Sequence, residues 1–155
     1  MTLHKYTQEE FDALPENAFG GKICPTGDYT KIRAFPNFSK FGNWATFGNW
    51  ATFGDRATFG YGAKFGKNCS LEGGRVKNGT FVTVGRIGSK NRTAYFYIDE
   101  NGEFFVRAGC WFSDEDSFIE RVKDVHGGTI YETQYLAALD YAKAVLSGML
   151  KEVNG

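Results

Sequence analysis

The sequence predicts a mainly β fold: a short solenoid of parallel strands, capped by an N-terminal helix and followed by a small α+β unit. Three observations predict it. A six-residue repeat runs through "FGNWATFGNWATFGDRATFGYGAKFG", residues 41–66. A helix-capping signal precedes this repeat, and a strand–turn–strand pattern with two amphipathic segments follows it. We therefore expect three parts, over residues 1–30, 31–90 and 91–155.

The first part begins with a capped helix. In "TQEEFDAL", Thr7 and Glu10 have the spacing of a capping box, and Pro15 ends the helix. Phe11 and Leu14 are expected to cover the open end of the solenoid. "CPTGDY", residues 24–29, is expected to be a turn that leads into the first coil.

The six-residue repeat predicts the structure of the second part. From residue 35 the chain reads FPNFSK, FGNWAT, FGNWAT, FGDRAT, FGYGAK, FGKNCS and LEGGRV. The first position is always apolar, the second is mostly Gly, and the fifth is mostly small. Neither the helical period of 3.6 nor the strand period of 2 produces this pattern, whereas three hexads that close a coil of 18 residues do. The first and fifth positions then fill the interior.

A coil of this length fixes which residues stack. Phe53 lies over Phe35, and Phe41 and Phe47 are followed one coil later by Phe59 and Phe65. The hexad threonines do not align, because the residue above Thr46 is Lys64 and the residue above Thr52 is Ser70. A flat array of threonines is therefore excluded. We expect "GGRVKNGTFVTVGRIGS", from residue 73, to finish the solenoid.

These hexads resemble the repeat of left-handed parallel β-helices, the hexapeptide-repeat family. Its pattern is an aliphatic residue, a Gly, small or acidic residue, two free positions, a small residue and one free position. The resemblance covers residues 35–76, with Phe in place of the aliphatic residue. It implies a short left-handed parallel β-helix. Because such prisms commonly associate as trimers, it also implies a possible homo-oligomer, a dimer or a trimer.

The third part contains a hairpin and two helices. "RTAYFYIDENGEFFVRAGCWF" is expected to pair two strands around Asn101 and Gly102. Ser113, with Asp116 three residues later, is expected to open a helix that ends at Gly127 and Gly128. A second helix is expected from about Glu132 to Leu150.

Composition narrows the class of protein. No apolar run approaches membrane-spanning length, so we expect no membrane partner and a cytoplasmic location, in the host cell if the chain is phage-encoded. Three widely spaced cysteines suit a reducing compartment. The net charge is zero, but residues 31–92 hold eleven Lys or Arg against two acidic residues. This basic segment steers an anionic partner, or it attracts the acidic remainder of the chain.

The resemblance implies two candidate enzyme classes. Hexapeptide acyltransferases use a His in a cleft between subunits, and the similar gamma-class carbonic anhydrases hold zinc with three His. This chain has only His4 and His126, both outside the repeats. We therefore expect no metal and no cofactor, and acyl transfer remains the enzyme alternative.

One cysteine and one histidine are candidates for a pair of nucleophile and base. Cys110 and His126 would form one if the fold joined them. We instead expect Cys110 to pack in the hairpin, Cys69 to pack in the coil, and His126 to lie at a helix C-terminus. No catalytic residue is predicted.

The candidate binding residues are aromatic and basic. Trp44 and Trp50 occupy an outward hexad position, where an exposed Trp suggests a contact surface. The full set is Trp44, Trp50, Arg56, Tyr61, Lys64 and Lys67, with Arg86, Lys90 and Arg92 of "GRIGSKNR". The alternatives are that the tryptophans cover the chain's own terminal elements or a subunit interface, and that "GRIGSKNR" is a solvated turn.

Segments that flank the hexads, "KICPTGDYTKI" and "RAGCWFSDEDSFIERVKDVHGG", resemble small bacterial and phage proteins. The leading hypothesis is a non-enzymatic interaction protein whose basic aromatic outer face binds a protein complex or nucleic acid. It would act as an inhibitor or anti-defence (anti-CRISPR-like) factor. The alternatives are an acyltransferase and a structural trimerisation module.

Overall fold

The computed structural model describes residues 2–154, with side chains over residues 2–149. The chain forms two compact units, Met1–Gly79 and Thr80–Gly155. Each unit has its own secondary structure and its own core, and each is described by itself below. Over the described residues, helix and strand have similar shares, so the fold is mixed rather than mainly β.

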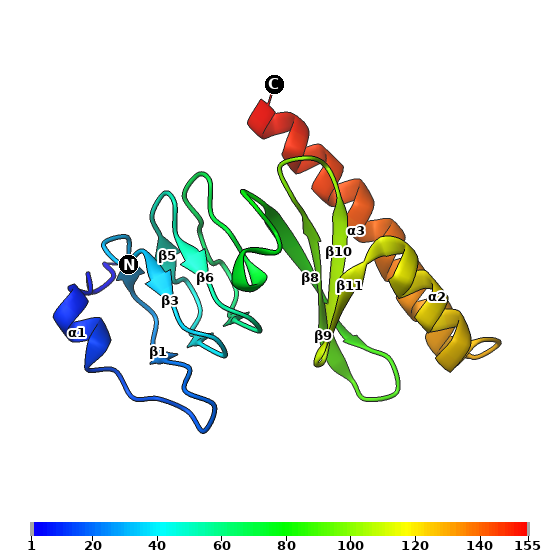
Figure 1. Cartoon of the computed structure of the whole chain (residues 1–155), viewed down its shortest axis with the longest axis horizontal. Helices are drawn as coiled ribbons and strands as arrows, with labels where there is room; N and C mark the ends of the chain where they lie inside the picture. The colour runs from blue at the N-terminus through cyan, green and yellow to red at the C-terminus, as the bar shows by residue number, and fades with distance from the viewer. Residues whose placement is uncertain (1, 155) are drawn as a thin grey trace. The chain divides into compact units, whose positions relative to one another are not determined.

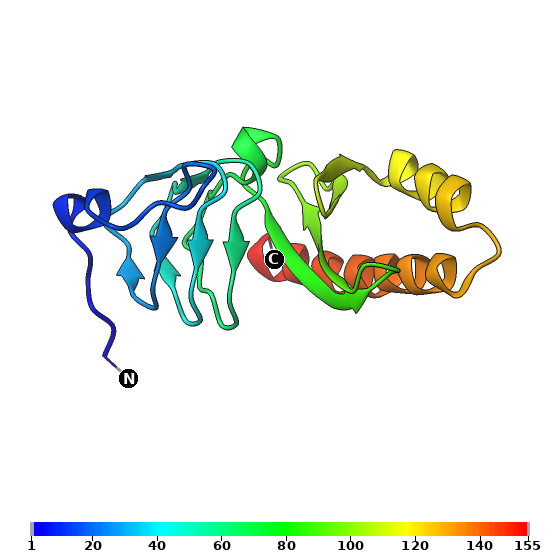
Figure 2. The ribbon, with the colours of Figure 1, turned by 90° about the horizontal axis from the view of Figure 1, so that it is seen from below.

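The first unit is a three-sided coil of short parallel strands (Figures 1 and 2). After helix α1 (Gln8–Asp12) its strands are β1 (Ile23–Cys24), β2 (Asp28–Tyr29), β3 (Ala34–Phe35), β4 (Lys40–Phe41), β5 (Thr46–Phe47), β6 (Thr52–Phe53) and β7 (Thr58–Phe59). They form three parallel sheets in the orders β1-β4-β7, β2-β5 and β3-β6. A short 3-10 helix, η1 (Glu72–Gly74), follows.

The register confirms the expected 18-residue coil. Phe35 pairs with Phe53 and Phe41 with Phe59, while isolated bridges join Thr46 to Lys64 and Thr52 to Ser70. The rings stack as expected, with centroids 4.9 Å apart for Phe35 and Phe53, 5.2 Å for Phe41 and Phe59, and 5.1 Å for Phe47 and Phe65. Rings in neighbouring columns meet edge to face, an arrangement that their quadrupoles favour. The core of the coil is thus three columns of rings.

The N-terminal cap forms as predicted. The Thr7 hydroxyl accepts the Glu10 N–H, and the Glu10 carboxylate accepts the Thr7 N–H. The helix ends at Asp12, before Pro15. Phe11 is buried and packs edge to face on Phe35, with centroids 5.3 Å apart. Tyr6 also covers this end, because its ring stacks on Tyr29 at 4.7 Å.

Both boundaries of the coil differ from those expected. Its first layer begins at Cys24, which pairs with Phe41, and continues through Tyr29, which pairs with Phe47. Cys24 and Tyr29 are apolar enough to replace Phe at the inward position, but the spacing between them is five, which hides the repeat. The segment "CPTGDY" is therefore part of the coil, and the stack is three layers deep.

At the other end, residues 80–87 do not finish the solenoid. They form β8 (Thr80–Ile87), which pairs antiparallel with β9 (Arg92–Ile98) in the second unit. The alternating apolar residues of this strand suit a sheet with one buried face better than a six-residue turn. The coil therefore lies within residues 23–79 rather than 31–90.

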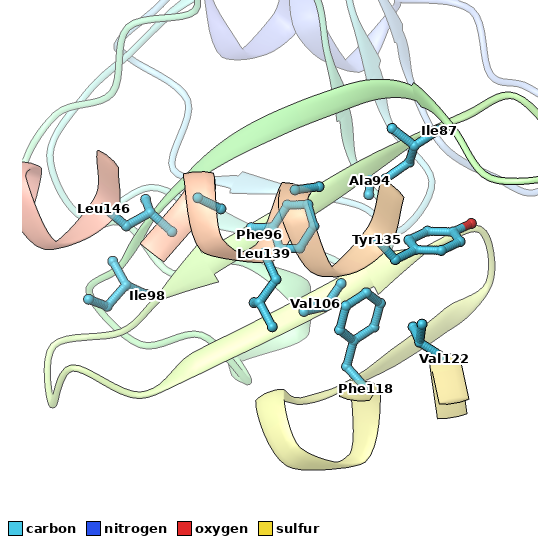
Figure 3. Packing of buried hydrophobic residues seen from close by; sticks show 12 residues of the cluster. Ile87, Ala94, Phe96, Ile98, Val106, Phe118, Val122, Tyr135, Leu139 and Leu146 are labelled. Carbon is cyan, nitrogen blue, oxygen red and sulfur yellow. The ribbon is translucent and has the colours of Figure 1, made fainter. Parts of the chain in front are cut away.

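The second unit is a four-stranded antiparallel sheet with two helices. Its other elements are β10 (Phe104–Ala108), β11 (Trp111–Asp114), α2 (Glu115–His126) and α3 (Ile130–Asn154). The strand order is β11-β10-β9-β8. The helices pack on one face of the sheet, and Figure 3 shows Phe96 and Val106 of the sheet beside Phe118 of α2 and Leu139 of α3.

The expected hairpin is the centre of this sheet. Ile98 pairs with Phe104 across a five-residue loop in which the Asp99 carboxylate accepts the backbone N–H groups of Asn101 and Glu103. The first helix is capped by Asp114 rather than Ser113, because β11 continues through Ser113 and Asp114 accepts the Ser117 N–H. The helix ends at Gly127 as expected, and the last helix begins at Ile130 rather than Glu132.

Candidate functional site

The outward tryptophans lie at corners of the coil, where the backbone bends sharply. The fourth residue of six successive hexads has a positive φ: Phe38, Trp44, Trp50, Arg56, Gly62 and Asn68. Only Gly and Asn adopt this left-handed conformation readily, because a Cβ crowds the following carbonyl. The bend therefore favours Gly62 and Asn68, and the bulky residues at equivalent corners are held there by the rest of the coil.

Asparagine side chains join successive layers at each corner. The Oδ1 atoms of Asn37, Asn43 and Asn49 accept the backbone N–H groups of Asp55, Tyr61 and Lys67, at 2.7, 3.0 and 2.8 Å. Each bond spans one coil and satisfies a backbone donor that the bend leaves without a strand partner. The third hexad position is thus structural wherever Asn occupies it.

The repeated glycine at the second hexad position allows neighbouring layers to approach closely. A methyl group at Gly60 would overlap the Asn43 Oδ1 atom, and it would lie 2.7 Å from the Asn43 backbone nitrogen. The second hexad position therefore requires Gly because neighbouring layers approach closely, while the positive φ belongs to the fourth position.

The predicted binding residues of the coil are distributed over three corners. The Trp44 corner consists of Asn43, Trp44, Tyr61 and Gly62; the Trp50 corner of Asn49, Trp50, Lys67 and Asn68; and the Phe38 corner of Asn37, Phe38, Asp55 and Arg56. Because successive hexads follow different sides of the coil, the two tryptophans do not share a corner. The predicted binding residues of the coil therefore lie on more than one of its sides.

The tryptophans are nevertheless well exposed. Trp44 is 50% exposed, Trp50 is 57% exposed and Tyr61 is 76% exposed. The Trp44 ring lies over Gly62, where a Cβ would overlap it. The Trp44 ring is therefore packed against the next layer on one side, and about half of each tryptophan is exposed.

The Phe38 corner holds an aromatic column that the sequence reading missed. The Phe19 and Phe38 rings stack at 5.2 Å, and the Arg56 guanidinium lies 5.3 Å from the Phe38 centroid on a later layer. Phe38 occupies the same hexad position as Trp44, which was a signal available in the sequence. Phe19 gave no such signal, since it lies in the loop before the coil.

The basic character of the coil is modest when the whole unit is counted. Residues 1–79 contain ten Lys or Arg against seven Asp or Glu, and residues 80–155 contain eight against eleven. Arg75 also pairs with Asp55 at 3.0 Å. A long-range field is therefore a weaker basis for recognition than the exposed rings.

The remaining predicted residues, Arg86, Lys90 and Arg92, belong to the second unit. Arg86 lies in β8 and Lys90 in the turn to β9, while Arg92 begins β9. Of these three residues, Arg92 lines the pocket beside α2.

That pocket has a volume of about 150 Å³ and lies beside α2. It is lined by Arg92, Ala108, Cys110, Trp111, Phe118, Arg121, Val122, Val125, His126 and Tyr135. The structure thus brings Cys110 and His126 to one cavity. The expectation that Cys110 packs in the hairpin is wrong, because the β10–β11 turn leaves its side chain exposed.

His126 lies at the C-terminus of α2, as expected. Its ring stacks on Tyr135, with centroids 5.5 Å apart and planes at 24°. This packing gives the imidazole a structural role in the pocket wall.

The three cysteines differ sharply in environment. Cys24 and Cys69 are buried in the coil. Burial raises the pKa of the Cys24 thiol to about 12 and also raises the pKa of Cys69. Cys69 packs in the coil as predicted, so Cys110 is the accessible thiol of the chain.

Over the described residues, no group of three or more His, Cys, Asp or Glu side chains has the arrangement of a metal site. Likewise, no helix in that part of the chain combines the length and apolarity needed to cross a membrane. Comparisons with protein-family models, with curated proteins and with solved structures found no match.

Proposed function

We propose that the protein is a non-enzymatic binding protein whose coil, a left-handed parallel β-helix of the hexapeptide-repeat kind, presents Trp44 and Trp50 to a protein partner. The observation that carries the proposal is the backbone of these residues. Trp44 has a φ of 66° and Trp50 a φ of 65°, and half of each side chain is exposed. A bulky residue in this conformation costs about 1–3 kcal/mol, and such strain clusters at functional sites.

The corners themselves do not need tryptophan. One layer later the same positions carry Gly62 and Asn68, the residues that this conformation favours. An exposed indole offers a large apolar area and one N–H donor, which is why Trp is enriched among the energetically dominant residues of protein interfaces.

A protein partner fits the corners better than a nucleic acid. Non-specific single-strand binding stacks successive bases on aromatic rings along a basic groove. Here the residue one layer above Trp44 is Gly62 and the residue above Trp50 is Asn68, so neither tryptophan belongs to a column of stacked rings. Separate anchors at two corners suit a partner surface that wraps an edge of the coil.

The test compares Trp50→Asn and Trp44→Asn with a matched control, Tyr141→Ala. Tyr141 is 59% exposed but lies in α3, outside the coil. The Trp variants are expected to lose capture of a nuclease-resistant partner from bacterial lysate, while the control keeps it. Their thermal stability should change by only about 1 kcal/mol, because relief of the positive φ offsets the lost packing.

Other outcomes would contradict the proposal. A large loss of stability in both Trp variants would show that the tryptophans are structural. Nuclease-sensitive capture would indicate a nucleic acid, and binding of acetyl-CoA with turnover would indicate an acyltransferase. If the captured partner is a nucleic-acid-handling complex of the host, inhibition of that complex by the wild-type protein tests the anti-defence hypothesis directly.

The oligomeric state is tested separately. Light scattering of the same preparations reports whether the chain is a monomer, dimer or trimer.

A further inference from the structure

We propose that the pocket beside α2 is a second binding site, which takes a carboxylate carried on a small apolar body. This site lies wholly in the second unit and is independent of the tryptophan corners. The proposal rests on the shape of the pocket, on the chemistry of its floor and on the charge at its rim.

The floor of the pocket is apolar. Phe118, Val122 and Tyr135 are buried, and Figure 3 shows the three side chains beside one another at the junction of α2 and α3. The Phe118 and Tyr135 rings meet edge to face at 5.9 Å. Trp111 is half-buried and extends the apolar wall. Such a floor favours a hydrocarbon or aromatic group.

The volume limits the size of that group. A cavity of about 150 Å³ is close to the size that holds a benzene ring, and it is smaller than a pocket for a drug-sized ligand. The ligand portion that enters is therefore one ring or a short aliphatic chain.

The rim is cationic. Arg92 and Arg121 both line the pocket, and no Asp or Glu is among its lining residues. Among the described side chains neither arginine forms an ion pair. The Arg121 guanidinium lies 4.9 Å from the Trp111 ring centroid, and Arg92 lies against the backbone at Gly109. These contacts hold both guanidinium groups in place, and the positive charges remain available to bind an anion.

This combination selects a planar anion. A guanidinium presents paired N–H donors that match the two oxygens of a carboxylate, and packing against Trp111 and Gly109 lowers the entropy lost on binding. A neutral molecule of the same shape would fill the floor but leave both cations without a counter-charge.

The chain contains its own reporter for this site. Cys110 lines the pocket and is exposed, whereas Cys24 and Cys69 are buried. Alkylation of the folded protein is therefore expected at Cys110. The rate of this alkylation depends on both the occupancy of the pocket and the local charge.

The first experiment measures protection. Alkylation of Cys110 by neutral iodoacetamide is followed by intact mass, with benzoate or its neutral analogue benzamide present. Benzoate at about ten times its dissociation constant should slow the reaction about tenfold, because only unliganded chains react. Benzamide should have little effect. Equal protection by the two compounds, or none by either, would overturn the proposal.

The second experiment measures the charge. The ratio of the alkylation rates with iodoacetate and iodoacetamide should fall several-fold in Arg121→Gln and in Arg92→Gln. It should stay unchanged in Lys123→Gln, which removes the same charge from α2 outside the pocket lining. Thermal melts identify any variant that fails to fold, and exposed Arg121 gives the safer variant. An unchanged ratio in a folded Arg121→Gln protein would refute the anion site.

The carboxylate could belong to a small molecule or to the end of a peptide. A short peptide that ends in Phe with a free carboxylate is therefore compared with benzoate, and its amidated form serves as the control. Stronger protection by the free-acid peptide supports a peptide terminus, and stronger protection by benzoate supports a small metabolite. Trp44→Asn and Trp50→Asn should leave both experiments unchanged, so failure of either proposal is distinguishable from failure of the other.

Discussion

At the scale of single residues, the hexad divides its positions between the interior, the corners and the surface. The Phe and the small residue face inward, the Gly allows close approach of the next layer, and the Asn at the third position bonds to that layer. Reading the third position as free was wrong wherever Asn occupies it, because its Oδ1 atom accepts a backbone N–H one coil later. Tyr61 and Lys67, which follow in the next layer, are the residues exposed there.

This pairing predicts that Asn43 and Gly60 are energetically coupled. Asn43→Ala removes the acceptor of the Tyr61 N–H and should cost about 0.5–1.5 kcal/mol. Gly60→Ala should cost more, because its Cβ would overlap Asn43. In the double variant the side-chain overlap is gone, so the losses should fall short of additivity by about 1 kcal/mol.

Chemical denaturation of the four proteins completes this cycle. Gly148→Ala is the control, since Gly148 lies in α3 with nothing within 4 Å of an added Cβ, and this substitution should be neutral or stabilising. Strict additivity of Asn43→Ala and Gly60→Ala would contradict the proposed contact between layers.

At the scale of elements, the coil is stabilised by ring stacking more than by its strands, which are only two residues long. Phe53 occupies the middle layer, stacked on Phe35 and edge to face with Phe47 and Phe59. Offset stacking of this kind adds to the free energy of apolar burial. Each column depends on the layer on either side of it.

Phe53→Ala should therefore lower the free energy of unfolding by about 3–5 kcal/mol. Phe19→Ala removes the same side chain from a site that is 71% exposed, and it should change stability by less than about 1 kcal/mol. Phe53→Asp should unfold the coil outright, because it places an unpaired charge among the rings. Thermal melts followed by circular dichroism distinguish these outcomes, and a folded Phe53→Asp protein would show that the first hexad position does not face inward.

At the scale of the whole molecule, the net charge is zero because the two units carry net charges of opposite sign. The two units also differ in fold. The coil unit has a surplus of basic residues, and the sheet and helix unit has a surplus of acidic ones. The cysteines follow the same division, with Cys24 and Cys69 inside the coil and Cys110 at a pocket of the second unit. The redox and pH responses of the chain should therefore separate by unit.

Cys24 predicts a loss of stability at alkaline pH. Its folded pKa is about 12, against an ordinary value of 9.0. The folded state thus retains the proton more strongly, so the contribution to stability is complete below pH 9 and declines as the pH rises toward 12. Between pH 7 and 10.5, wild type should lose about 2 kcal/mol more than Cys24→Ala in urea unfolding. Identical pH dependence of the two proteins would show that Cys24 is not buried as described.

Much of the coil could be predicted from the sequence because its contacts repeat at a fixed separation. Once three hexads close a coil, the stacking of Phe35 on Phe53 and the offset of Thr46 from Thr52 follow from counting. The start of the first layer could not be found this way, since Cys24 lies five rather than six residues before Tyr29 and neither residue is a Phe. The first unit's cap was predictable because Thr7 and Glu10 act within one turn of helix.

The sequence by itself therefore determined the 18-residue coil, its ring columns, its N-terminal cap and the central hairpin, since each depends on contacts between residues at short or regular separations. Only the tertiary structure showed that Trp44 and Trp50 lie at bends of the backbone with a positive φ. It also brought Arg92, Cys110, Arg121 and His126 to one pocket. Those four residues come from a strand, a turn and a helix, and only the order of the sheet and the packing of α2 on it make them neighbours.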